Sequence, residues 1–321
     1  MTDRIRARQR RWRIQAESLG ILVLLVGLLG LAATLVAGPS FGLLVITGAT
    51  LLGLFMPQMP PHLVMRLHRA RPLQPGELPW LDARLGDLAR RAGLQRTPQC
   101  WLMPGHSLNA FATGTPEQGA IAISSGMLRH LDARHLQGVL AHEVTHLANR
   151  DVALLAFAGQ AAGIVRMLAT LTWMLVLLSL PLVLIGAVAI HPLTLLLLAC
   201  TPTAALLLVQ ALSRSREYAA DLGAAELLGS PRHLAEALSL LERSQRPLFW
   251  PFRLANPEDA IPVWLRSHPP AAERIRRLRE LGDSGRHAPV PPPWTGRGRR
   301  ARDWDGVIIP ERLPPRRPFL V

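Results

Sequence analysis

Residues 19–37 read LGILVLLVGLLGLAATLVA and carry no charged side chain. A helix needs about 20 apolar residues to cross the hydrocarbon core of a bilayer, so this run has the length and composition of a membrane span. Gly38, Pro39 and Ser40 end it. Further uncharged runs cover residues 41–59, 167–190 and 193–212, with His191 and Pro192 between the last two. We therefore expect two transmembrane helical hairpins.

Each predicted hairpin has an alternative interpretation. The first run follows a basic segment and has small residues near Ala32, as a signal peptide does. It is long for the apolar part of a signal, however, and a second apolar run follows at once, so we expect an uncleaved anchor. The second hairpin, residues 167–212, can either cross the bilayer fully or form a re-entrant or partly buried hairpin.

The composition also favours a membrane protein. Of the 321 residues, 49% are hydrophobic and 18% are charged, whereas about 25% are charged in an ordinary globular chain. This hydrophobicity excludes disorder over the whole length. Cys100 and Cys200 are the only cysteines, which excludes a disulfide scaffold.

The basic residues predict the orientation in the membrane. There are 36 of them against 22 acidic residues, a net charge of +14, and all are arginine. The links inside the two hairpins carry none, whereas the outer flanks carry Arg4, Arg6, Arg8, Arg10, Arg11, Arg13, Arg66, Arg69, Arg71, Arg214 and Arg216. Basic residues stay on the cytoplasmic side, so we expect both termini and everything between the hairpins in the cytoplasm.

The segments outside the hairpins predict a small α+β unit. Apolar residues recur at helical spacing from Leu78 to Ala92, and Asp132 is a plausible N-cap for a helix from about Ala133 to Asn149. Short strands are expected at 99–103, 110–113 and 119–123, and further helices at 217–229 and 233–246.

From residue 283 to the end the chain is rich in Pro and Arg, and we expect no packed core there. A solvated tail is the favoured interpretation, with contact to anionic lipid headgroups as the alternative. We expect no nucleic-acid partner, because no recognition fold and no interleaved aromatic pattern accompanies the arginines.

Residues 141–151 read AHEVTHLANRD. His142 and His146 are four residues apart, so on a helix both imidazoles project from one face and can hold one metal ion. Glu143 lies about 100° further round the helix, within reach of a proton on an attacking water. The alternative is a solvated helix face with two coincidental histidines, and the helical pattern around the motif favours the metal site.

A hydrolytic zinc site needs three protein ligands and an open position. Glu217 is the best candidate for the third, and Asp221 shares its helix face four residues on. One carboxylate can ligate while the other orients a histidine through its free ring nitrogen. Spacing alone does not choose this interpretation over an ordinary solvated acidic surface.

Four motifs stand in one order: NAFATG (109–114), HEVTHLANRD (142–151), SREYAADLGAAELLG (215–229) and SHPPAAERIRRL (267–278). Together with the two hairpins, they resemble the HtpX-like membrane zinc metallopeptidases, which are relatives of the CAAX prenyl endoproteases. The resemblance covers residues 15–280. It implies a mainly α fold with a small β-sheet, in which transmembrane helical hairpins carry a cytoplasmic gluzincin-type α+β metallopeptidase domain in a bacterial inner membrane.

The resemblance also implies the site. One Zn²⁺ per subunit would be held by His142, His146 and Glu217, with Glu143 as general base and Asp221 supporting a ligand from behind. Positions matching Asn109 and His268 lie near the substrate cleft of the family and hold substrate backbone or the developing oxyanion. The alternative roles are a turn residue for Asn109 and a residue leading into a helix for His268.

The expected domains follow from these features. A basic N-terminus (1–18) precedes the first hairpin (19–59), and the peptidase domain (60–282) is interrupted by the second hairpin (167–212) and followed by the tail (283–321). Only five residues separate Leu212 from Glu217, and about 20 separate His146 from Arg166, roughly 30 Å if helical. The zinc site is therefore expected close to the membrane surface.

The expected function is a zinc endopeptidase that hydrolyses membrane or misfolded proteins at the cytoplasmic face, as in membrane protein quality control. The strand at 119–123 can pair with an extended substrate segment. The alternatives are a signalling metalloprotease with one dedicated substrate and a non-catalytic membrane scaffold. Serine and cysteine chemistry is disfavoured, because neither cysteine has a histidine-paired context and Ser124-Ser125-Gly126 is not a nucleophile elbow. The sequence makes no prediction of the oligomeric state.

Overall fold

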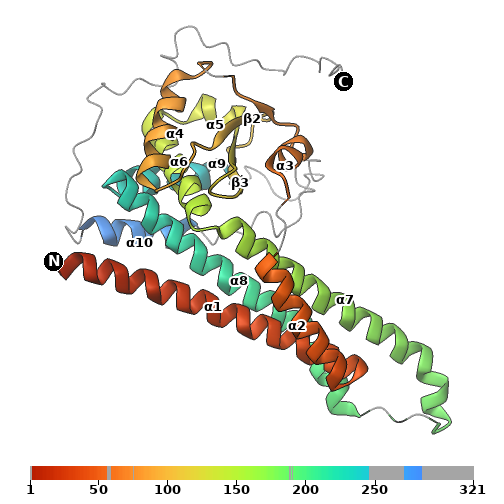
Figure 1. Ribbon diagram of the computed structural model, residues 1–321. Helices are drawn as coiled ribbons and strands as arrows, with labels where there is room; N and C mark the ends of the chain where they lie inside the picture. The colour runs from red at the N-terminus through yellow and green to blue at the C-terminus, as the bar shows by residue number, and fades with distance from the viewer. Residues whose placement is uncertain are drawn as a thin grey trace. The chain divides into compact units, whose positions relative to one another are not determined.

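The computed structural model describes residues 2–55, 59–74, 76–187, 189, 191–245 and 271–283 (Figure 1). They divide into two compact units, and the division passes through two helices, between Val152 and Ala153 and between Ala219 and Ala220. We name them the bundle unit and the sheet unit. His268 and the Pro/Arg-rich tail lie outside the described residues.

The described residues of the bundle unit form four helices. They are α1 (Thr2–Ala37), α2 (Pro39–Phe55), α7 (Asp151–Leu184) from Ala153 onward and α8 (Pro192–Leu228) as far as Ala219. The break between α1 and α2 is Gly38, whose φ of +86° lies in the left-handed region that glycine adopts without steric cost. The first predicted hairpin is therefore a pair of helices joined by a single residue.

Much of the outside of the bundle unit is apolar. Its core contains Leu25, Ala158 and Ala205, from three different helices. Large side chains further along α7 are exposed, with Leu177 and Leu178 at 72% and 77% of their full accessible area. An apolar surface of this kind is costly in water and suits a lipid environment.

Three helices among the described residues are long and apolar enough to cross a membrane. They are α1 from Trp12 to Ala37, α7 and α8. The fourth apolar helix, α2, has 17 residues, and residues 56–58 of the predicted run lie outside the described residues. The helices of the second hairpin are longer than their apolar runs. The sequence predicted a separate helix from Glu217, but nothing in residues 213–217 breaks a helix and α8 continues through them.

The sheet unit contains a four-stranded mixed sheet in the order β1-β2-β4-β3. The strands are β1 (Arg71–Pro72), β2 (Gln99–Met103), β3 (Ala110–Gly114) and β4 (Gly119–Ser124), and β2 pairs with β4 in parallel. The three predicted strands are thereby confirmed. The prediction that residues 119–123 pair with a substrate is wrong, because β4 is bonded to β2 on one side and β3 on the other. The terminal strand next to β4 is β3.

Alternate residues of the strands face opposite sides of the sheet, as the twofold period of a strand requires. Leu102, Ile121 and Ile123 belong to the main core. Trp101 and Ala122 face the other side, where they pack with Met65 of the short helix α3 (Pro61–Leu67). The main core is completed by α4 (Pro79–Arg91), α5 (Ser125–His130), α6 (Ala133–Ala148), α9 (Arg232–Gln245) and α10 (Ala271–Asp283).

Helix α6 is the central element of the sheet unit, and almost all of its residues from Leu136 to Leu147 are buried. Its predicted N-cap is confirmed, because the Asp132 carboxylate accepts hydrogen bonds from the backbone N–H groups of Arg134 and His135. The helix ends at Ala148, and Arg150 adopts a left-handed φ of 59° before α7 begins. The helix is therefore interrupted between Ala148 and Asp151, and the condition for a length of about 30 Å from His146 to Arg166, one continuous helix, is not met.

Candidate metal centre

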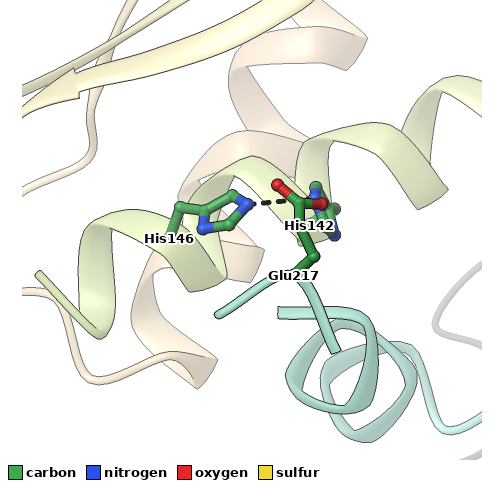
Figure 2. A group of neighbouring side chains, drawn as sticks. All are labelled: His142, His146 and Glu217. Carbon is green, nitrogen blue, oxygen red and sulfur yellow. Dashed lines mark hydrogen bonds between the residues drawn. The ribbon is translucent and has the colours of Figure 1, made fainter. Parts of the chain in front are cut away.

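The two histidines of the motif lie on one buried face of α6. His142 is 4% exposed and His146 is 7% exposed. The ring centroids are 4.6 Å apart, and the ring planes are nearly perpendicular. Their Nε2 atoms approach to 3.0 Å (Figure 2). The one-turn spacing therefore directs a nitrogen of each ring to one place, as the sequence predicts.

Glu217 brings a carboxylate oxygen to the same place. It lies on α8, and Figure 2 shows its side chain pointing toward the two imidazoles. One potential ligand atom each from His142, His146 and Glu217 lies within 4.8 Å of the other two, and all three residues are buried. Among the described residues, no other set of three His, Cys, Asp or Glu side chains meets this condition.

Each histidine is supported from behind by a buried carboxylate. Nδ1 of His142 lies 3.1 Å from Oδ1 of Asp221, and Nδ1 of His146 lies 2.8 Å from Oδ2 of Asp151. An ionised carboxylate only accepts hydrogen bonds, so Nδ1 is the donor in both rings. This tautomer leaves the lone pair on each Nε2.

The chemistry of these donors fits a divalent metal ion. Two Nε2 lone pairs at 3.0 Å repel each other, and a cation held by both removes that repulsion. Two imidazole nitrogens with one carboxylate oxygen form a three-ligand set that hydrolytic zinc sites use. Burial excludes the interpretation of a solvated helix face for all three residues.

Three further residues predicted for the site, Glu143, Asn109 and His268, do not belong to the group of three potential ligands. Glu143 is 5% exposed on α6, directly after the first histidine. Asn109 precedes β3 and is exposed, and its backbone exchanges hydrogen bonds with Ser124. The structure does not bring Asn109 into the group of three ligands. His268 lies outside the described residues.

Two buried residues of the centre were missed at the sequence level. Asp151 ends the HEVTHLANRD motif, and Arg274 lies in the last of the four motifs. Arg274 contacts Asp221 and the ring of His142. An acidic residue shortly after the second histidine was a usable signal for Asp151. Nothing in the spacing of the motifs pointed to Arg274.

In the part of the chain that the structure describes, Cys100, Ser124 and Ser125 are not set up as nucleophiles. Burial, together with the nearby Asp82 carboxylate, raises the pKa of the Cys100 thiol to about 12, so the thiolate is not available at neutral pH. The hydroxyl groups of Ser124 and Ser125 donate to the backbone carbonyls of Ser107 and Gly105. These two serines fix the loop before β3.

The comparison with known families agrees with the metal centre. The pattern described as Peptidase family M48 matches residues 75–282, which include all the ligand candidates. The chain belongs to peptidase family M48. It is therefore a membrane-associated metalloprotease with peptide or protein substrates, and the predicted resemblance to HtpX-like enzymes is confirmed.

Several curated M48 relatives are similar over most of their length. A protease HtpX homolog of Persephonella marina is 34% identical over 280 residues, which cover 81% of this chain and 95% of the relative. Another, from Acaryochloris marina, is 35% identical over 279 residues and is covered to 92%. The crystal structure of S. mikatae Ste24p has a TM-score of 0.45 and 19% identity, and the match covers 86% of this chain and 65% of Ste24p.

Proposed function

We propose that this M48 metalloprotease is a zinc endopeptidase that cuts membrane or misfolded proteins at the cytoplasmic face of a bacterial inner membrane. The observation that carries the proposal is the buried group of His142, His146 and Glu217, within 4.8 Å of one another. One Zn²⁺ per subunit is the expected metal, because two imidazoles and one carboxylate are a zinc ligand set.

The reaction follows from the residues around this group. Bound zinc would lower the pKa of water to about 7 and polarise the scissile carbonyl. Glu143 takes the proton of the attacking water and passes it to the leaving amine. Asp221 and Asp151 keep the imidazoles in the Nδ1–H tautomer throughout, because each carboxylate accepts from one ring.

Strand β3 is the candidate for holding the substrate backbone. It is one of the two terminal strands of the described sheet, and α6 packs against it. An extended peptide added to this edge gains main-chain hydrogen bonds that do not depend on its side chains, which favours low sequence specificity. Asn109, at the start of this strand, and His268 are proposed to hold substrate backbone or the developing oxyanion.

A membrane-proximal site is supported by helix α8. Its apolar run ends at Leu212, and Glu217 follows five residues later on the same unbroken helix, about 7.5 Å along its axis. The arginines beside the apolar runs support a cytoplasmic position for this end of the helix. Such a site reaches substrates embedded in the membrane or stalled beside it, which is the basis for the proposed quality-control role.

The test measures zinc content and casein or self-cleavage of the purified full chain and of the Glu143→Gln variant. We expect one zinc per chain in both, and cleavage reduced about 10²- to 10⁴-fold in the variant because its general base is lost. Glu280→Gln is the matched control, since Glu280 is an exposed carboxylate on α10. Unchanged cleavage by Glu143→Gln would refute the proposed base, and wild-type protein without metal would refute the centre.

The substrate class has its own test. One peptide is presented in proteoliposomes either soluble or tethered to the lipid, at equal total concentration. We expect the tethered peptide to be cut faster, because the site lies close to the membrane surface. Equal rates would contradict a preference for membrane proteins while leaving the zinc chemistry intact.

A further inference from the structure

Arg274 is an unusual residue for its position on α10. It is 3% exposed and shares the buried side of the helix with Ile275 and Leu278. Two other arginines of α10, Arg276 and Arg277, have side chains that are 64% and 49% exposed. A buried guanidinium is costly unless it is paired and hydrogen-bonded, so a residue of this kind on an apolar face calls for a specific partner.

The partner is Asp221, and the two side chains form a bidentate ion pair. Arg274 Nε donates to Oδ2 at 2.8 Å, and Nη2 donates to Oδ1 at 2.6 Å. Two parallel hydrogen bonds between a guanidinium and a carboxylate fix the orientation of the carboxylate plane as well as its distance. Asp221 is itself 4% exposed, so the pair is shielded from solvent.

The same carboxylate supports the metal centre. Oδ1 of Asp221, which accepts from Arg274, is also the atom 3.1 Å from Nδ1 of His142. Nη2 of Arg274 lies 3.3 Å and 3.4 Å from the two nitrogens of that ring. Because Nδ1 already donates to Asp221, Nε2 is the ring nitrogen that can accept from the guanidinium, at 3.3 Å. Arg274 therefore fixes both the carboxylate and the imidazole that it orients.

The two partners of this ion pair come from distant segments of the chain. Arg274 is 53 residues after Asp221, and α10 is held in place by its packing on α9 and by Ile275 and Leu278 in the main core. The guanidinium can reach Asp221 only while α10 is docked. Anything that undocks α10 must therefore release the support of His142.

We infer that Arg274 is a positioning residue of the metal centre, which fixes Asp221 against His142 and thereby makes metal affinity depend on the docking of α10. The inference rests on the proposed zinc centre. It has a reciprocal consequence, because two coupled equilibria affect each other by the same factor. If docking of α10 raises the affinity for zinc, binding of zinc must stabilise the docked helix.

The test measures zinc affinity by chelator competition for the purified full chain and three variants. For Arg274→Met we expect zinc to bind about 10- to 100-fold more weakly, as is typical when the partner behind a metal ligand is lost. Arg274→Lys keeps the charge but not the planar two-point fork, so a loss of at least about tenfold is expected there too. Arg276→Met is the matched control on the exposed side of α10, and its affinity should equal that of wild type.

Hydrogen exchange of the wild-type protein with and without zinc supplies a readout that does not depend on whether a variant folds. In the wild-type protein, zinc should slow amide exchange in α10, and this slowing should be absent in Arg274→Met. Wild-type protein that binds zinc with no change in α10 exchange would overturn the inference. So would Arg274→Met with wild-type zinc affinity and only a lower thermal midpoint without metal, because that result assigns the residue a purely structural role. Wild-type protein that binds no zinc would instead remove the proposed function, and the inference with it.

Discussion

The two histidines of the proposed metal centre are supported in different ways. His146 is held by Asp151, which is five residues along the chain and reaches back because the backbone turns at Arg150. His142 is held by Asp221, on another helix, and Asp221 is held in turn by Arg274 from α10. One support is built by a local turn, and the other by three helices that meet only in the folded protein.

Because the two supports are built differently, different substitutions are expected to weaken the support of His146 and the support of His142. The His146 support depends on a few backbone torsions and on one short hydrogen bond of 2.8 Å. The His142 support depends on the packing of α8 and α10 against α6, so substitutions far away in the sequence reach it. We therefore expect the two sides to respond differently to mutation, and the following predictions are ordered from the largest effect to the smallest.

Removing Glu217, which belongs to neither support, should have the largest effect. Glu217→Ala takes away the proposed third ligand, so zinc affinity should fall by more than the roughly 10- to 100-fold that loss of a supporting residue costs. Cleavage should fall with it. Zinc content by mass spectrometry is the measurement, with Glu226→Ala on the same helix as control. Retention of zinc by Glu217→Ala would exclude it as the third ligand.

Comparing Asp221→Asn with Asp151→Asn tests the asymmetry directly. Both should weaken zinc binding by about 10- to 100-fold, because each loses the ionised acceptor behind a histidine. Asp221→Asn also leaves the buried charge of Arg274 without its counter-ion, which can cost up to about 3–5 kcal/mol of unfolding free energy. The thermal midpoint without metal should therefore fall much further for Asp221→Asn. Equal midpoints for the two variants would contradict the asymmetry.

Gly223→Ala tests the packing of α8 on α6. An added Cβ would lie 2.4 Å from Cγ2 of Thr145, the residue just before His146. Overpacking of this kind costs about 1–3 kcal/mol, and it should weaken zinc binding because it pushes α8 away from α6. Gly86→Ala is the control. Its added methyl would meet only the Thr97 hydroxyl at 3.7 Å, so calorimetry should find it neutral or stabilising.

The smallest effect is expected at the local turn. Arg150 has a φ of 59°, and Arg150→Val places a β-branched residue in that region at a cost of about 1–2 kcal/mol. Arg150→Gly should be close to neutral, because it relieves the backbone while losing an exposed ion pair with Glu117. Chemical denaturation of the two variants is the measurement. A Val variant as stable as the Gly variant would show that this turn is not strained.

Much of the fold is readable from the sequence because the signals are local. The hydrophobic runs predict the bundle unit, alternation predicts β2, β3 and β4, and Asp132 predicts the start of α6. The elements without a local pattern were missed, such as β1, which has two residues and exists only through its pairing with β2. The order of the strands was also beyond the sequence. It is set by packing, and it makes β3 rather than β4 the terminal strand next to α6.

The residues of the proposed metal centre also divide into those that local spacing predicts and those that only the tertiary structure brings together. The i, i+4 spacing of His142 and His146 determines by helix geometry alone that both rings share a face, and Glu143 follows from the same turn of helix. Spacing within α8 placed Glu217 and Asp221 on one face, but only the fold decided that this face meets α6. Arg274 shows the limit most clearly. Its local pattern is that of one more arginine in a basic helix, and the partner that gives it a role lies 53 residues away, because contacts between distant segments are decided by tertiary packing.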